Sequence, residues 1–212
     1  MKRIKIVLLS ALIFIALTSF GQQVLKIEPA GEKLLQFYRS LNVENLWLKG
    51  IHVNWETGEP DNPEATKNVK THCSSFAAAA CKKLNIYLLR PPEHKVTLLA
   101  NAQYDWLSTN EAWQQGWRTI ISTDYKQIQL FANQGHVVVI VWKNTEHNKP
   151  GHIALVNPNE IEENTLSERT LLMIQAGGTN SSCIPLKKAF KNHIHKWTES
   201  NVAFYYNLSV MN

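Results

Sequence analysis

The sequence predicts an α+β fold, in which a helix that begins at a cysteine packs on an antiparallel sheet of about four strands. Helical patterns occupy the first half of the chain, and apolar strand patterns follow in the second half. Helices first and strands second are typical of α+β proteins rather than of alternating βαβ units. Residues 22–212 are enough for one domain with a full hydrophobic core.

The first 21 residues have the pattern of an export signal. Three basic residues precede an apolar run, 6–17, which is too short to span a bilayer comfortably. Small residues at Ser19 and Gly21 predict cleavage after Gly21. We therefore expect a signal peptide over 1–21 and an exported protein, periplasmic or secreted, with residues 22–212 as a single domain and no membrane contact after cleavage.

Helical patterns occur five times before Gly135. Apolar residues at i, i+3, i+4 and i+7 predict an amphipathic helix over 32–41. We expect Thr71 to cap a helix from Cys73 to about residue 85, in which four consecutive alanines allow another element to approach closely. Further helices are predicted over 96–107, over 110–115 and from a Thr123 cap to Gly135.

The second half predicts four strands and one short helix. The continuous apolar run 137–142 is typical of a fully buried strand. The next strand, 153–156, follows a polar connection, and His152, Ala154 and Val156 should share one of its faces. The remaining strands are predicted over 171–176 and 202–208, with a short helix near Pro185 between them.

Cys73 and His152 are the candidate nucleophile and base. A thiol in the first turn of a helix lies at the positive end of the helix dipole, which favours the thiolate. A histidine fixed at the start of a neighbouring strand can take the thiol proton and return it to a leaving amine. The plainer alternatives are a buried structural cysteine and a strand-end histidine bonded to a carbonyl.

A third group is needed to hold the His152 imidazole, and Gln175 is the first candidate. It is a polar residue at the end of an apolar strand and precedes two glycines that let the backbone approach closely. Asn157 and Asn180 are the alternatives. An oxyanion hole would combine the backbone N–H of Cys73 with one donor from the preceding residues; the candidates are His72, Asn68, Trp55 and Asn54.

Three cysteines leave at least one thiol unpaired. Cys73 and Cys81 lie on one predicted helix and are separated by roughly 12 Å, too far for a disulfide. A bridge between Cys81 and Cys183 would leave Cys73 as the free thiol, and the alternative is that Cys81 is a buried free cysteine.

The chain is rich in aromatic residues, with seven tryptophans and six tyrosines. Trp106, Trp113 and Trp117 are close in sequence. Core packing is one interpretation. The other is that Trp106 and Trp117, together with His72 and Trp55, line a groove that binds sugar or peptide.

Histidine spacing gives little support for a metal site. His147 and His152 flank a Pro-Gly turn, and His193 and His195 form a His-x-His pair, but no acidic or cysteine partner stands at a metal-ligand spacing. We expect His193 and His195 to lie in a solvated loop, and we expect no metal and no other cofactor. Because three positive charges of the formal +5 lie in residues 1–21, the domain carries about +2, which argues against nucleic-acid binding.

Three features together resemble the NlpC/P60 and CHAP group of papain-like cysteine peptidases and amidases. They are the helix start Thr71-His72-Cys73-Ser74-Ser75-Phe76, the strand Gly151-His152-Ile153-Ala154-Leu155-Val156, and Gln175 on the next strand. The resemblance covers roughly residues 68–178. It implies a papain-like core that hydrolyses an amide bond in cell-wall peptides, with Cys73 as nucleophile, His152 as base and Gln175 as orienting residue. The sequence departs from the pattern at His72, where Asp is usual, and at Gln175, where His, Asn or Glu is common.

These observations predict an exported, monomeric cysteine hydrolase that cleaves peptidoglycan or another peptide through a thioester. The alternative is a non-catalytic module of the same fold that holds cell-wall fragments. The distance between the Cys73 sulfur and a His152 ring nitrogen separates the two, because an enzyme needs these atoms within about 4 Å of each other.

Overall fold

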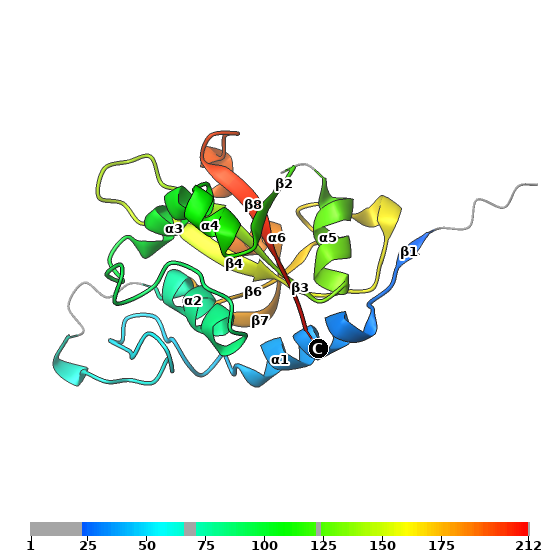
Figure 1. Ribbon diagram of the computed structural model, residues 1–212. Helices are drawn as coiled ribbons and strands as arrows, with labels where there is room; N and C mark the ends of the chain where they lie inside the picture. Colours follow the sequence, from blue (N-terminus) through cyan, green and yellow to red (C-terminus); the bar gives the residue numbers. More distant parts are fainter. Residues whose placement is uncertain (1–22, 66–70, 122–123, 212) are drawn as a thin grey trace, which may run out of the picture.

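The computed structural model describes residues 23–65, 71–121 and 124–211, and its centre is a six-stranded antiparallel sheet with helices on both faces (Figure 1). The mixed α and β architecture and the antiparallel sheet therefore agree with the predicted fold class. In spatial order the strands are β2 (Trp117–Ile120), β8 (Val202–Val210), β3 (His136–Trp142), β4 (His152–Val156), β6 (Leu172–Gln175) and β7 (Ser181–Pro185).

The sheet is larger than the four strands expected, because two edge strands were missed. The four predicted strands correspond to β3, β4, β6 and β8. β2 and β7 add one strand at each edge of the sheet. β2 has only four residues and β7 is half polar, so neither has the apolar run that marks a buried strand. A separate two-stranded sheet pairs β1 (Val24–Leu25) with β5 (Ile161–Glu162).

The helices lie where their patterns predict them, although two capping predictions do not stand. They are α1 (Pro29–Ser40), α2 (Cys73–Lys83), α3 (Leu99–Leu107), α4 (Asn110–Gln114), α5 (Tyr125–Asn133) and the short α6 (Leu186–Ala189). The N-cap of α2 is His72 rather than Thr71, and it makes no side-chain capping bond. α5 is capped by Asp124, whose carboxylate accepts the Gln127 N–H. The predicted cap Thr123 and the predicted signal peptide lie outside the described residues.

Side chains of β3 and β4 alternate between two apolar layers. Val139 and Val141 of β3, with Ile153 and Leu155 of β4, face the layer that contains α2. The residues between them belong to a second layer, formed with α5 and α6. Because both faces of the sheet are covered, these strands read as continuous apolar runs in the sequence.

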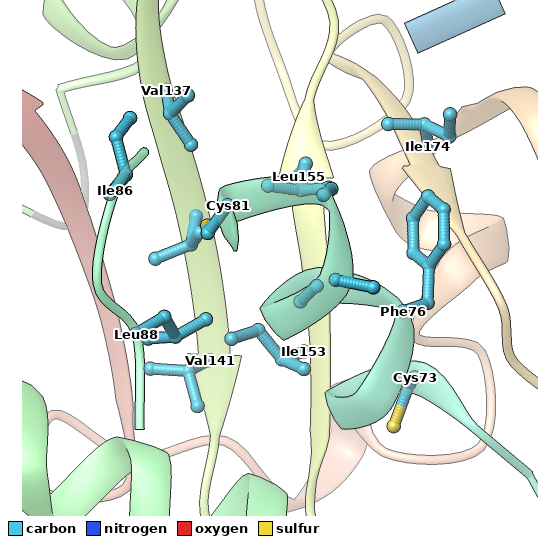
Figure 2. Packing of buried hydrophobic residues seen from close by; sticks show 14 of the residues in the cluster. Cys73, Phe76, Cys81, Ile86, Leu88, Val137, Val141, Ile153, Leu155 and Ile174 are labelled. Carbon is cyan, nitrogen blue, oxygen red and sulfur yellow. The ribbon is translucent and has the colours of Figure 1, made fainter. Parts of the chain in front are cut away.

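The alanine-rich helix α2 is packed against the centre of the sheet. All nine of its residues from Cys73 to Cys81 are buried. Figure 2 shows Cys81 at one end of the helix, among side chains that include Ile86 and Val137, and Cys73 at the other end. Cys81 is a buried free thiol and Cys183 is an exposed one, so no disulfide joins them. Within the described ranges, no helix combines the length and apolarity needed to cross a bilayer.

Replacing Ala77 by leucine should destabilise the protein, because its methyl group is fully buried between α2 and the sheet. We expect the free energy of unfolding to fall by about 1–3 kcal/mol from overpacking. Lys83→Leu, at an exposed position of the same helix, should change it by less than about 0.5 kcal/mol. Urea titration of both variants measures the difference, and equal stabilities would contradict the close packing of α2.

Candidate active site

Cys73 is the first residue of α2, as the sequence predicts. The preceding residue fixes this helix start, because His72 Nε2 donates a hydrogen bond to the Ile51 carbonyl at 2.8 Å. The Cys73 side chain is only 4% exposed. In Figure 2 its sulfur points away from Phe76. The thiol therefore sits at the rim of the apolar layer that α2 shares with the sheet.

The surroundings of Cys73 favour the neutral thiol. Burial raises the pKa of the Cys73 thiol above its usual value. Hydrogen bonds from the backbone N–H groups of Ile153 and Ser74, and from the Thr71 hydroxyl, only partly oppose this rise. The expected lowering of the pKa by the helix start is therefore wrong as a net effect, because desolvation of the thiolate outweighs the donors around it.

His152 is the first residue of β4, and Gln175 is the last residue of the neighbouring strand β6. The His152 Nε2 and Gln175 Oε1 atoms are 2.7 Å apart. An amide oxygen can only accept, so Nε2 donates and carries the ring proton. The Gln175 amide nitrogen donates in turn to the Thr179 carbonyl at 2.9 Å, which fixes the orientation of the amide. The expected contact between Gln175 and His152 is therefore present.

The other ring nitrogen of His152 is free to act as a base. Among the described residues none forms a hydrogen bond with Nδ1. The two alternative orienting residues are engaged elsewhere: Asn157 Nδ2 donates to the Ser182 carbonyl, and Asn180 Nδ2 donates to carbonyls of the loop that follows α1. An imidazole with a protonated Nε2 keeps its lone pair on Nδ1, which is the arrangement that a proton acceptor needs.

Packing fixes the position of the His152 ring. Phe190 contacts it edge to face, with ring centroids 4.6 Å apart. On another side lies Gly177, where an added Cβ would come within 3.0 Å of His152 Cε1. A side chain at position 177 would therefore crowd the imidazole, which gives a reason for the first of the two glycines that follow Gln175.

Burial also keeps the His152 imidazole neutral. Desolvation lowers the pKa of His152 from 6.5 to about 4, and the hydrogen bond to Gln175 opposes the shift only in part. Burial and the neighbouring His152 likewise lower the pKa of His193 to about 4. At neutral pH the site therefore contains neutral imidazoles and an unionised thiol rather than an ion pair.

The structure places Cys73 and His152 on adjoining cavities. Cys73 and His72 line a cavity of about 640 Å³. His152, Gln175 and His193 line another, of about 580 Å³. The two share the lining residues Thr71, Pro150 and Gly151. No hydrogen bond joins the thiol to the imidazole within the part of the chain described, so the predicted contact between them stays a prediction.

Trp106 and Trp117 are core residues, and the prediction that they line a substrate groove is wrong. Trp117 is 2% exposed and its indole N–H donates to the Tyr87 carbonyl at 2.7 Å. Trp106 packs edge to face on Tyr87 and is also buried. Neither lines either cavity. These tryptophans fill the α2 layer of the core because their strand and helix turn these positions inward.

Of the remaining candidates near Cys73, one lines a cavity and two do not. His72 lines the Cys73 cavity, as expected of a substrate-binding residue. Trp55 is half-buried against the core, lies 5.4 Å from the Lys82 ammonium and lines neither cavity. Asn54 Oδ1 accepts backbone N–H groups of its own turn, and Asn54 lines neither cavity. Asn68 lies outside the described residues.

His193 is the site residue that sequence reasoning missed. We expected a solvated loop, but its ring is stacked on Trp142 at 4.5 Å and lies 5.8 Å from the His152 ring. One feature of the sequence could have pointed to His193. Phe190 stands three residues earlier, a spacing that puts the Phe190 and His193 rings on the same side of a helical turn. No group of three or more His, Cys, Asp or Glu residues suited to a metal ion occurs in the described ranges.

A scan of protein-family models found no match to this chain, and a search of curated proteins found none either. The interpretation of the site therefore depends on its own geometry.

Acid should destabilise the protein through His152. The unfolded imidazole has a pKa near 6.5 and the folded one near 4. The contribution of His152 to the free energy of unfolding is therefore fully present above pH 6.5 and is lost as the pH falls to 4. This loss amounts to at most about 3 kcal/mol. In His152→Asn this loss should be smaller when unfolding is followed by urea titration at each pH. His195→Gln, at an exposed site, should keep the wild-type slope, and an identical slope for His152→Asn would contradict the buried neutral imidazole.

The three thiols should react with iodoacetamide in a fixed order at neutral pH. Cys183 is exposed and should react first. Cys73 lines a cavity and should follow, and Cys81 should be slowest because it is fully buried with its pKa raised to about 12. His152→Ala should slow only Cys73, since it removes the base. Peptide mass spectrometry of the wild-type protein gives the three rates, and a Cys183→Ser background isolates those of Cys73 and Cys81. Equal rates at Cys73 and Cys81, or indifference to His152, would count against an activated thiol.

Proposed function

We propose that this protein is an exported cysteine hydrolase that cleaves an amide bond in peptidoglycan peptides through a thioester intermediate. The observation that carries the proposal is the hydrogen bond between Gln175 and the Nε2 of His152. It leaves Nδ1 as a free base at the start of β4. The next residue of that strand, Ile153, donates its backbone N–H to the Cys73 thiol.

Chemistry at this site would begin from a neutral pair. As the Cys73 sulfur attacks the substrate carbonyl carbon, His152 Nδ1 takes the thiol proton, so that no free thiolate has to exist beforehand. The imidazolium formed then gives this proton to the leaving amine, and the C–N bond breaks to leave a thioester. Water, deprotonated by the same nitrogen, hydrolyses the thioester and restores the thiol.

Gln175 would act through His152 rather than on the substrate. Its amide oxygen would accept a hydrogen bond from the Nε2–H group in every step and would hold the ring with Nδ1 facing the reacting atoms. The backbone N–H of Cys73 lies beside its own sulfur. It is therefore a donor for the oxyanion that forms on the attacked carbonyl, where such donors contribute most.

The arrangement of elements supports a papain-like core for the proposed enzyme. α2 packs on β4 and β6 with the cysteine at its N-terminus. The β4–β6 register pairs Leu155 with Ile174, so the start of β4 meets the end of β6. This juxtaposition brings a histidine and an amide together from two strands. The pattern of residues 1–21 predicts export. Export would bring the enzyme to cell-wall peptides, which lie outside the cytoplasm.

A binding module is the second candidate, and one observation favours it. No hydrogen bond joins Cys73 to His152 within the described residues, and a protein that only holds cell-wall fragments would need none. Under the enzyme proposal, the substrate would extend from the Cys73 sulfur to His152 across Thr71 and Gly151, which line both cavities.

Digestion of purified peptidoglycan, with mass analysis of the released fragments, tests the proposal. Cys73→Ala and His152→Ala should lower the rate by about a thousand-fold or more, because each removes a chemical step. Gln175→Ala should lower it less, by about ten- to hundred-fold, since water can partly replace the amide. Cys183→Ser, the matched cysteine control, should digest at the wild-type rate. Binding of peptidoglycan by the wild-type protein without release of fragments would establish the binding module instead.

A further inference from the structure

The cavity beside His152 and Gln175 is lined by an unusual set of charges. Three lysines line it: Lys49 from the loop after α1, Lys188 from α6 and Lys191 just after α6. His152 and His193 line it as well. No aspartate or glutamate is among the lining residues described. Three segments that are distant in sequence thus place only positive or neutral groups around one volume of about 580 Å³.

These three lysines are not compensated by neighbouring carboxylates. None of them forms an ion pair with a described residue, although other lysines nearby do. Lys187, the residue before Lys188, pairs with Glu168 at 3.6 Å, and Lys196 pairs with Glu146. The acidic side chains of this region are therefore directed to lysines outside the cavity, and the charge of the cavity itself is left unbalanced.

Such a cavity favours an anionic ligand. All three lysines are exposed to solvent, and like charges grouped around one cavity raise the local concentration of an oppositely charged group. Thr71, Thr179 and Asn192 also line the cavity and can donate hydrogen bonds to the oxygens of a carboxylate. Because His152 forms one wall, a ligand held there would present its neighbouring atoms to Nδ1.

We propose that this cavity is a subsite for a free carboxylate of the substrate, so that the protein selects acidic peptides over neutral ones. Lys49, Lys188 and Lys191 would bind the carboxylate, and the amide bond to be cleaved would lie between this subsite and Cys73. This inference rests on the proposed function, because it assigns the substrate class of the same site. It adds a specificity determinant in the cavity that adjoins the Cys73 cavity at Thr71, Pro150 and Gly151.

Binding measured without turnover tests the subsite. A Cys73→Ala protein is titrated with a fluorescent cell-wall stem peptide that carries free carboxylates, and with the same peptide after amidation. The acidic peptide should bind about tenfold more tightly than the amidated one, and this preference should shrink as salt is added. Adding Lys49→Gln, Lys188→Gln and Lys191→Gln together should abolish the preference and leave the affinity for the amidated peptide unchanged.

Lys187→Gln is the matched control, since this lysine neighbours Lys188, already has a carboxylate partner and does not line the cavity. It should keep the full preference. Equal affinities for the two peptides, a preference that survives the triple substitution, or an equal loss with Lys187→Gln would overturn the subsite. A protein that shows the preference but never hydrolyses peptidoglycan would overturn the proposed function alone, and one that hydrolyses acidic and amidated peptides equally would overturn the subsite alone.

Discussion

The hydrogen bond from His152 to Gln175 is the interaction on which the interpretation of this molecule depends. It joins the start of β4 to the end of β6, and it decides which ring nitrogen carries the proton. The Gln175 amide is itself held by the Thr179 carbonyl, and Gly177 leaves room for the ring. Sheet register, a fixed amide and a missing Cβ thus act together to hold the ring in one orientation, with its proton on Nε2 and the lone pair of Nδ1 free.

Burial determines the chemistry that this arrangement supports. Desolvation raises the pKa of Cys73 and lowers that of His152, so both groups are held in their neutral forms. A preformed thiolate–imidazolium pair would need both shifts to be reversed by mutual attraction. Under the proposed function, the neutral pair would instead couple proton transfer to sulfur attack, so that charge would develop only in the presence of the substrate.

Much of the fold could be predicted from the sequence, because its strongest patterns are local. The apolar run that became β3, the alanine-rich helix and the His152 strand depend on periodicity and turn residues, which act over a few positions. β7 could not be predicted, since its polar residues form a strand only by pairing with β6. The sequence predicted Thr71 as the cap of α2, but the cap is the next residue, His72. The hydrogen bond that holds His72 joins it to Ile51, twenty-one residues away, and local sequence does not reveal such a contact.

The same limit applies to the site. The proximity of His152 and Gln175 follows from adjacent strands, and it was predictable from chain order. The direction of the Cys73 pKa was not, because it depends on how deeply neighbouring elements bury the thiol. Trp106 and Trp117 could fill a core or line a groove, and only tertiary packing decides between these roles. His193 and the three lysines of the cavity come together through the fold of distant segments, which composition does not reveal.

The most direct test of this account is a ¹⁵N NMR measurement of the His152 ring at neutral pH, before and after Cys73 is alkylated. The account predicts a neutral ring with its proton on Nε2 and a bare Nδ1, whose resonance shifts when the sulfur is modified. Treatment of a Cys73→Ala control, which keeps Cys81 and Cys183, with the same reagent should leave that resonance in place. A proton on Nδ1, a doubly protonated ring, or an Nδ1 resonance indifferent to the state of Cys73 would contradict a thiol and an imidazole that work as one unit.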